Sequence, residues 1–152
     1  MEDIKYDARL IEIKVKASKK EDVLKILADD LKALDYVEDN FYEHVVEREK
    51  NFPTGLPTAI PIALCHTEAQ YVKHAAVCLA TLEKPVKFQE MGTPQNTIMA
   101  EMVFLIAMKN PKDQVPWLRK MMEFCKDLHG LETIRDSVDK VKLADFLRQH
   151  LA

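Results

Sequence analysis

Apolar residues recur along this chain at two spacings, every second residue in some segments and every third to fourth residue in others. Residues 8–16 alternate, as expected of a strand with one buried face. Helical spacing follows to about Leu34, and Ser18 with Glu21 predicts a capping box at the start of this helix. The chain therefore opens with a half-buried strand and an amphipathic helix.

A second helix is expected from about Asp39, with Arg48 in its last turn. A cation at the C-terminal end of a helix is favourable, so Arg48 can be a solvated terminal charge or part of a site. Residues 53–58, PTGLPT, follow as a rigid loop, because Pro53 and Pro57 are incompatible with a helix.

A short, buried strand over residues 61–65 ends at His66. Residues 67–70, TEAQ, form a Thr-x-x-Gln capping box that predicts a short helix over about 68–74. Adjacent side chains of a strand point to opposite faces, so Cys65 is expected in the core and His66 outside it, at the end of the sheet.

The second half of the chain predicts three further strands and three helices. The strands are expected at 75–80, 85–89 and 101–108, with a loop over 93–98. The helices are expected at 112–128, 132–137 and 142–151. Asn110 and Pro111 provide a cap and first residue for the first of these helices, and Gly130 is expected to close it. The intermixed elements predict a single α/β domain over residues 1–152, with a mixed β-sheet flanked by α-helices.

Composition narrows the range of partners and compartments. The 152 residues fit one domain, and a formal net charge of −3 argues against nucleic acid as the main partner. The charged first residues are unlike a secretory signal, and no apolar run reaches transmembrane length. Three cysteines without CxxC spacing indicate reduced, buried thiols. We therefore expect a cytoplasmic protein that is not inserted in a membrane.

His66 is the strongest candidate for chemistry. An imidazole has an ordinary pKa of about 6.5, so much of it is neutral at pH 7 and can act as a nucleophile. The helix start at Thr67, the backbone beside Gly55 and the Arg48 guanidinium could together hold an anion such as a phosphoryl group. A histidine at a strand end is more often structural, so this pattern alone leaves both interpretations open.

The remaining histidines do not suggest a metal site. No pair of them has the His-x-x-x-His spacing of a zinc-binding helix, so neither a metal nor another cofactor is predicted. They are His44, His74, His129 and His150.

Three motifs strengthen the case for His66. They are an Arg-Glu pair at 48–49, Phe-Pro-Thr-Gly-Leu at 52–56, and Ile-Ala-Leu-Cys-His-Thr at 62–67. Together they resemble the fructose/mannitol/galactitol-type enzyme IIA domains of the bacterial phosphoenolpyruvate:sugar phosphotransferase system. The likeness continues through 72–88 and 103–114, and the Asn-Pro-x-x-Gln helix start is most similar to the galactitol-specific branch.

This resemblance implies a phosphoryl carrier. The phosphocarrier protein HPr would phosphorylate His66, and phospho-His66 would pass the group to a cysteine of enzyme IIB for uptake of a sugar, for which the branch resemblance suggests one like galactitol. Arg48, Thr54, Gly55 and Thr67 would stabilise the transferred charge.

The chain departs from the family pattern at two places. Cys65 stands where the family usually has proline, and residues 112–114 lack the second histidine of mannitol- and fructose-type members, so Gln114 would supply its hydrogen bond. Two alternatives stay open: a regulatory interaction module that senses phosphorylation, which related domains also form, and a degenerate scaffold that is not phosphorylated.

Overall fold

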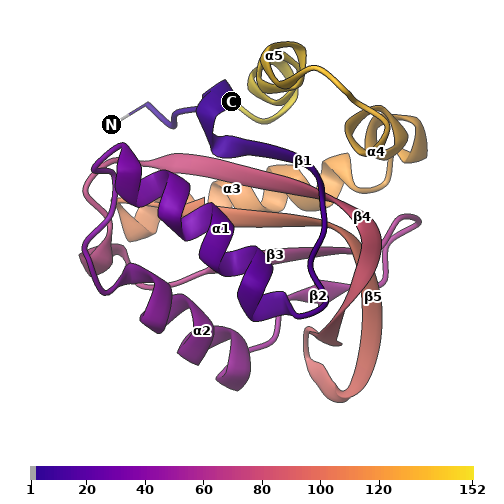
Figure 1. Cartoon of the computed structure of the whole chain (residues 1–152), viewed down its shortest axis with the longest axis horizontal. Helices are drawn as coiled ribbons and strands as arrows, with labels where there is room; N and C mark the ends of the chain where they lie inside the picture. The colour runs from indigo at the N-terminus through magenta and orange to yellow at the C-terminus, as the bar shows by residue number, and fades with distance from the viewer. Residues whose placement is uncertain (1–2) are drawn as a thin grey trace.

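A computed structural model describes residues 3–152 (Figure 1). Over these residues the chain forms a single α/β domain with a mixed, five-stranded sheet and five α-helices, which confirms the predicted class. The strands are β1 (Ile11–Val15), β2 (Gly55–Leu56), β3 (Ile62–His66), β4 (Ala76–Glu90) and β5 (Thr93–Ala107). The helices are α1 (Lys20–Ala33), α2 (Phe41–Asn51), α3 (Pro111–Phe124), α4 (Leu128–Arg135) and α5 (Lys140–Leu151). Two 3-10 turns, η1 (Ala8–Leu10) and η2 (Ala69–Tyr71), precede β1 and follow β3.

The long antiparallel hairpin of β4 and β5 forms the centre of the sheet. β1 pairs in parallel with β4, and β3 pairs in parallel with β5. β2 is antiparallel to β3, and its Gly55 also pairs with Glu90 near the tip of the hairpin. The outer half of the hairpin bends away from the rest of the sheet, as Figure 1 shows. β2 is therefore held between β3 and the hairpin tip.

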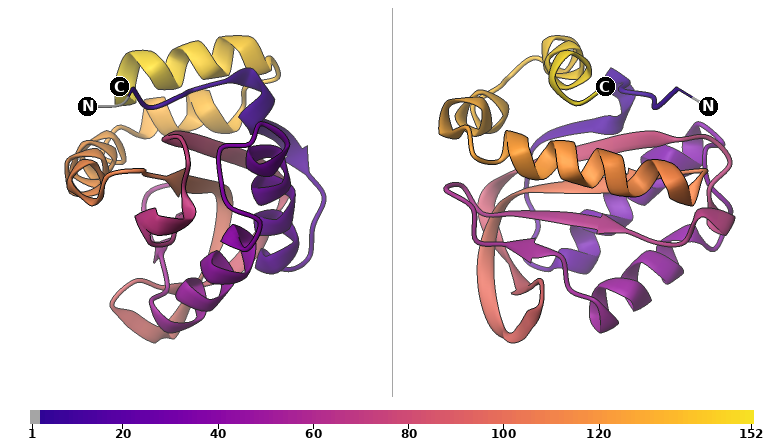
Figure 2. Two further views of the ribbon diagram at one scale, coloured as in Figure 1. Left: turned by 90° about the vertical axis from the view of Figure 1, so that its left-hand side faces the viewer. Right: turned by 180° about the vertical axis from the view of Figure 1, so that it is seen from behind.

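Helices cover both faces of the sheet (Figure 2). The buried side chains of α1 and α2 pack on one face, and those of α3, α4 and α5 pack on the other. The residues of β3 alternate between these two cores: Ala63 and Cys65 face the first, and Ile62 and Leu64 face the second. This alternation confirms that Cys65 lies in the core.

The hairpin is more continuous than predicted. The strands expected at 75–80 and 85–89 are one continuous strand, β4, and the loop expected over 93–98 is the first half of β5. Most residues of this half are exposed and polar, and strands that lack a buried face resemble loops in sequence. The turn expected near Gly92 is confirmed, with a φ of 77° that suits glycine.

The helix ends agree with the sequence at some positions and differ at others. Asn110 caps α3 as predicted, accepting a hydrogen bond from the Lys112 amide at 3.0 Å. The capping box expected for α1 is wrong, because Lys19 occupies the cap position without a side-chain hydrogen bond. α3 ends at Phe124, and Gly130 lies inside α4 instead of closing α3.

All three cysteines are free and buried, as the sequence predicted. Burial raises the pKa of Cys65 and Cys78 well above the ordinary range, and it raises the pKa of Cys125 to about 11. These thiols are therefore protonated at neutral pH. Among the described residues, no helix has the length and apolar character needed to cross a bilayer.

Candidate functional site

His66 lies at the C-terminal end of β3, where the strand meets a cavity of about 220 Å³. The cavity is enclosed by the last turn of α2, the segment that follows β3, and the first turn of α3. Its lining residues are Arg48, His66, Thr67, Glu68, Ala69, Pro111, Gln114 and Val115. The side chain of His66 is buried except for a small part, since the residue is 9% exposed. Four of the six predicted site residues therefore meet in one place: His66, Arg48, Thr67 and Gln114.

The imidazole of His66 is fixed by its own strand. Its Nδ1 lies 3.0 Å from the backbone carbonyl oxygen of Leu64. A carbonyl oxygen can only accept, so Nδ1 carries the proton of the neutral ring and Nε2 keeps its lone pair. Burial lowers the pKa of His66, the Leu64 bond opposes this effect, and the charge of Arg48 adds to it. A neutral imidazole with Nε2 as its nucleophile is therefore the main form at pH 7.

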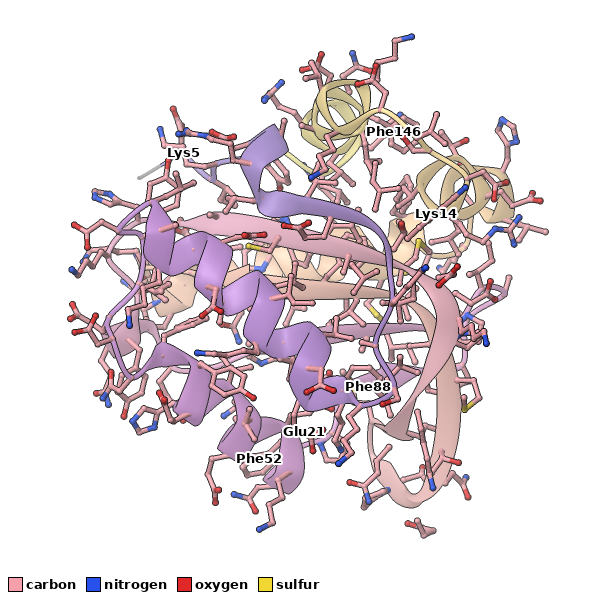
Figure 3. The ribbon with its side chains drawn as sticks, viewed as in Figure 1. Lys5, Lys14, Glu21, Phe52, Phe88 and Phe146 are labelled. Carbon is pink, nitrogen blue, oxygen red and sulfur yellow. The ribbon has the colours of Figure 1, made fainter. Side chains whose placement is uncertain are left out.

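Arg48 lies in the last turn of α2, as predicted. Its Nη1 is 3.6 Å from a carboxylate oxygen of Glu68, and its guanidinium lies 5.0 Å from the ring centre of Phe52. Within residues 3–152, the buried Nε of Arg48 has no hydrogen-bond partner. Phe52 is 62% exposed and lies at the end of α2 (Figure 3). Arg48 therefore places its charge at the wall of the cavity, while its Nε stays buried behind that wall.

The helix expected after His66 is wrong. The chain forms only the three-residue turn η2, capped by Glu68 without a side-chain hydrogen bond. The Thr67 hydroxyl donates instead to the Glu68 carboxylate at 2.6 Å. A turn of this length has no macrodipole of consequence, so the positive charge expected from a helix start at Thr67 is absent, and Arg48 is the charged donor that lines the cavity. Glu68, which the sequence did not single out, contacts both Thr67 and Arg48.

Thr54 does not line the cavity. Its hydroxyl donates to one carboxylate oxygen of Glu49 at 2.7 Å, and its amide donates to the other at 2.9 Å. The same hydroxyl lies 3.5 Å from Sγ of Cys65, in the core beneath His66. Glu49 is only 2% exposed, so its carboxylate is buried and does not face water.

Gly55 also lies apart from the cavity. It pairs with Ala63, three residues before His66, which corresponds to about 10 Å along a strand. A Cβ on Gly55 would lie 2.6 Å from the backbone oxygen of Gln89 and 2.8 Å from Cγ1 of Ile98. The absence of a side chain here permits a close approach to the hairpin. Contact of Thr54 or Gly55 with a phosphoryl group stays a prediction.

Solved structures of IIA proteins share this fold. Mannitol IIA from Escherichia coli superposes with a TM-score of 0.73 at 23% identity, covering 96% of this chain and 98% of that one. The complex of E. coli enzyme IIAMtl with phosphorylated enzyme IIBMtl gives a TM-score of 0.71 at 26% identity, covering 91% and 96%. The nitrogen regulatory protein IIA-Ntr of Neisseria meningitidis gives 0.72 at 18% identity, covering 93% and 94%.

The family is shown by sequence. Residues 6–150 match the family model described as "Phosphoenolpyruvate-dependent sugar phosphotransferase system, EIIA 2", and the chain belongs to this family. Its curated relatives include the galactitol-specific EIIA component of E. coli K12, which is 29% identical over 99 residues. That match covers 64% of this chain and 65% of the relative, so it spans slightly less than two thirds of the relative's length.

Proposed function

We propose that this protein is a phosphoryl carrier in which Nε2 of His66 accepts a phosphoryl group from phospho-HPr and passes it to a cysteine of enzyme IIB. The observation that carries the proposal is the geometry of one ring. Leu64 holds Nδ1, so Nε2 is the nitrogen left to react in a cavity that Arg48 also lines. The relay would operate in the cytoplasm.

The transfer itself requires little of the protein beyond position and charge. The lone pair of Nε2 forms a bond to phosphorus while the bond between phosphorus and the donor's histidine nitrogen breaks, and that electron pair returns to the donor ring. The positive charge that develops on the His66 ring is stabilised by the bond from Nδ1–H to the Leu64 carbonyl. Arg48, which lines the cavity, offsets the charge of the bound phosphoryl group. A thiolate of enzyme IIB then attacks phosphorus and restores neutral His66.

The comparisons support enzyme IIB as the acceptor and a galactitol-like sugar as the final destination. The first rests on the E. coli complex of IIAMtl with phosphorylated IIBMtl, and the second on the galactitol-specific relatives. Two exposed apolar side chains would contact either partner: Val115, which lines the cavity, and Phe52, which packs on Arg48. Gln114, from the first turn of α3, would donate a hydrogen bond to the phosphoryl group, and Thr67 would do so after releasing Glu68.

Incubation with enzyme I, HPr and phosphoenolpyruvate, followed by mass spectrometric mapping of the acid-labile phosphate, tests this proposal. The label should lie on His66 and disappear in His66→Ala. His44→Ala is the matched control, because His44 stacks on Tyr71 at 3.8 Å outside the cavity, and it should be labelled at the rate of the parent. Full labelling of His66→Ala would overturn the assignment. A labelled His66 that transfers nothing to enzyme IIB would favour the regulatory alternative.

A further inference from the structure

A buried polar cluster lies directly behind the cavity and takes no part in the chemistry above. It consists of Glu49, Thr54 and Cys65, which are 2%, 3% and 0% exposed. Thr54 connects the other two, since it donates twice to Glu49 and its hydroxyl lies 3.5 Å from the sulfur of Cys65. Burying a carboxylate is costly unless its oxygens are hydrogen-bonded, and Thr54 provides a bond to each oxygen.

Two residues of this cluster are each adjacent in sequence to a residue that lines the cavity. Glu49 follows Arg48 in the last turn of α2, and Cys65 precedes His66 at the end of β3. Successive side chains point in different directions in both a helix and a strand, so one residue of each pair faces inward and the other faces the cavity. The inward residues are joined through Thr54.

Building on the proposed function, we propose that Glu49 and Thr54 are positioning residues, which hold the Arg48 turn and the His66 strand in register for phosphoryl transfer. The connection reaches the imidazole through the backbone. The amide of Leu64 donates to the carbonyl of Thr54 at 3.3 Å, and the carbonyl of Leu64 accepts from Nδ1 of His66. Thr54 therefore contacts the end of α2 through its hydroxyl and amide, and β3 through its carbonyl. This arrangement gives Thr54 a role other than phosphoryl binding.

The test compares three substitutions of buried threonines. Thr54→Val removes the hydroxyl with little change in volume, and Thr54→Ser retains it. Thr81→Val is the matched control, because Thr81 is 1% exposed and its hydroxyl accepts a hydrogen bond from the Lys14 amide, at the opposite edge of the sheet from His66. Each variant is measured under conditions in which circular dichroism shows it to be folded.

Two measurements separate positioning from general destabilisation. The first is single-turnover phosphorylation by phospho-HPr over a range of donor concentrations. Thr54→Val should lower the saturating rate roughly ten-fold or more, because small displacements of reacting groups have effects of this size. The donor concentration at half-saturation should stay within about two-fold of the parent, since the docking surface is unchanged. The second is the ¹⁵N NMR spectrum of the His66 ring, in which Thr54→Val should shift Nδ1 and Nε2 toward values of a mixed tautomer population.

Thr54→Ser and Thr81→Val should retain the parent's rate and ring shifts. The proposal is overturned if Thr54→Val matches Thr81→Val in both rate and ¹⁵N shifts, or if only the half-saturating donor concentration changes. The ring shifts do not depend on any phosphoryl donor. If the parent itself is not phosphorylated, the proposed function fails while the NMR comparison still decides whether this cluster positions His66.

Discussion

Substitution of Gly55 by alanine separates the two roles that can be assigned to this glycine. One role is contact between its backbone and a phosphoryl group, and the other is tight packing of β2 against the hairpin of β4 and β5. A new Cβ would lie 2.6 Å from the backbone oxygen of Gln89 and 2.8 Å from Cγ1 of Ile98. Both separations are shorter than van der Waals contact allows, so one of the two segments must move.

The loss in free energy of unfolding for Gly55→Ala depends on which neighbouring segment can move to make room for the new Cβ. The nearer obstacle is a backbone carbonyl next to Glu90, which pairs with Gly55, and the amide of Met91 donates to the Gly55 carbonyl at 2.8 Å. Displacing this segment disturbs those pairings, which places the cost near the upper end of the range for overpacking, about 3 kcal/mol. The lower conformational entropy of an unfolded chain with alanine offsets up to about 1 kcal/mol. The net loss in free energy of unfolding should be about 2 kcal/mol, or a fall in Tm of roughly 4–8 °C.

Urea denaturation of Gly55→Ala and of Gly130→Ala measures this loss. Gly130 lies in α4, where a Cβ would meet the ends of the Phe124 and Asp127 side chains at 2.8 and 2.9 Å, and these can rotate away more readily than a backbone. Alanine also has a higher helix propensity, so Gly130→Ala should stay within about 1 kcal/mol of the parent. A Gly55→Ala protein as stable as the parent would refute the packing argument. One that folds normally but loses phosphorylation of His66 would return Gly55 to the phosphoryl site.

Three further predictions concern charge. Because burial lowers the pKa of His66, its phosphorylation rate should be flat near pH 7 and should fall only as the pH drops through a value below the ordinary 6.5. The stability that the neutral ring contributes should decline from about pH 6.5 downward, until the pH has passed the lowered pKa. Stopped-flow transfer at each pH measures the rate, and urea denaturation measures the stability. Arg48→Ala should slow phosphorylation roughly ten- to hundred-fold, and the rate of Arg48→Lys should lie between those of Arg48→Ala and the parent. Equal rates for all three proteins in stopped-flow transfer would show that Arg48 is not part of the site. Burial and the neighbouring Glu12 raise the pKa of Asp30 to about 7. The folded state therefore binds the proton more tightly than the unfolded state, and the stability of the parent should fall as the pH rises from about 4 to about 7. Asp30→Asn should flatten this part of the curve of stability against pH, and an unchanged curve would contradict the raised pKa.

The sequence predicted the framework of the fold because apolar spacing reports burial directly. The amphipathic pattern of α1 and the unbroken apolar run of β3 both became buried faces, and the Asn110-Pro111 cap formed as expected. The outer half of the β4–β5 hairpin was missed, because its exposed strand residues carry no apolar periodicity. Capping boxes were predicted twice and formed neither time, since a competing local hydrogen bond can engage the capping side chain first. Thr67 illustrates this, because its hydroxyl bonds to Glu68.

The sequence predicted residues that line the cavity but not the buried residues behind it. Local pattern placed Arg48 at a helix end and His66 at a strand end, and the resemblance of the motifs at 48–49 and 62–67 to enzyme IIA domains then singled out both residues as site residues. The assignment of Thr54 could not be made in the same way. Whether its hydroxyl faces the cavity or the core depends on Glu49, whose burial results from packing between α2 and β3. A charged residue beside an arginine gives no sequence signal that it is buried.

The burial of all three thiols has a practical consequence for studying this protein. Cys65, Cys78 and Cys125 are shielded from solvent and protonated at neutral pH, so alkylating reagents should leave them unmodified in the native state. A single cysteine introduced at Met91, which is 41% exposed at the hairpin tip, would then be the one position to accept a maleimide dye. Fluorescence from that dye would follow partner association in real time without first replacing any native residue of the core.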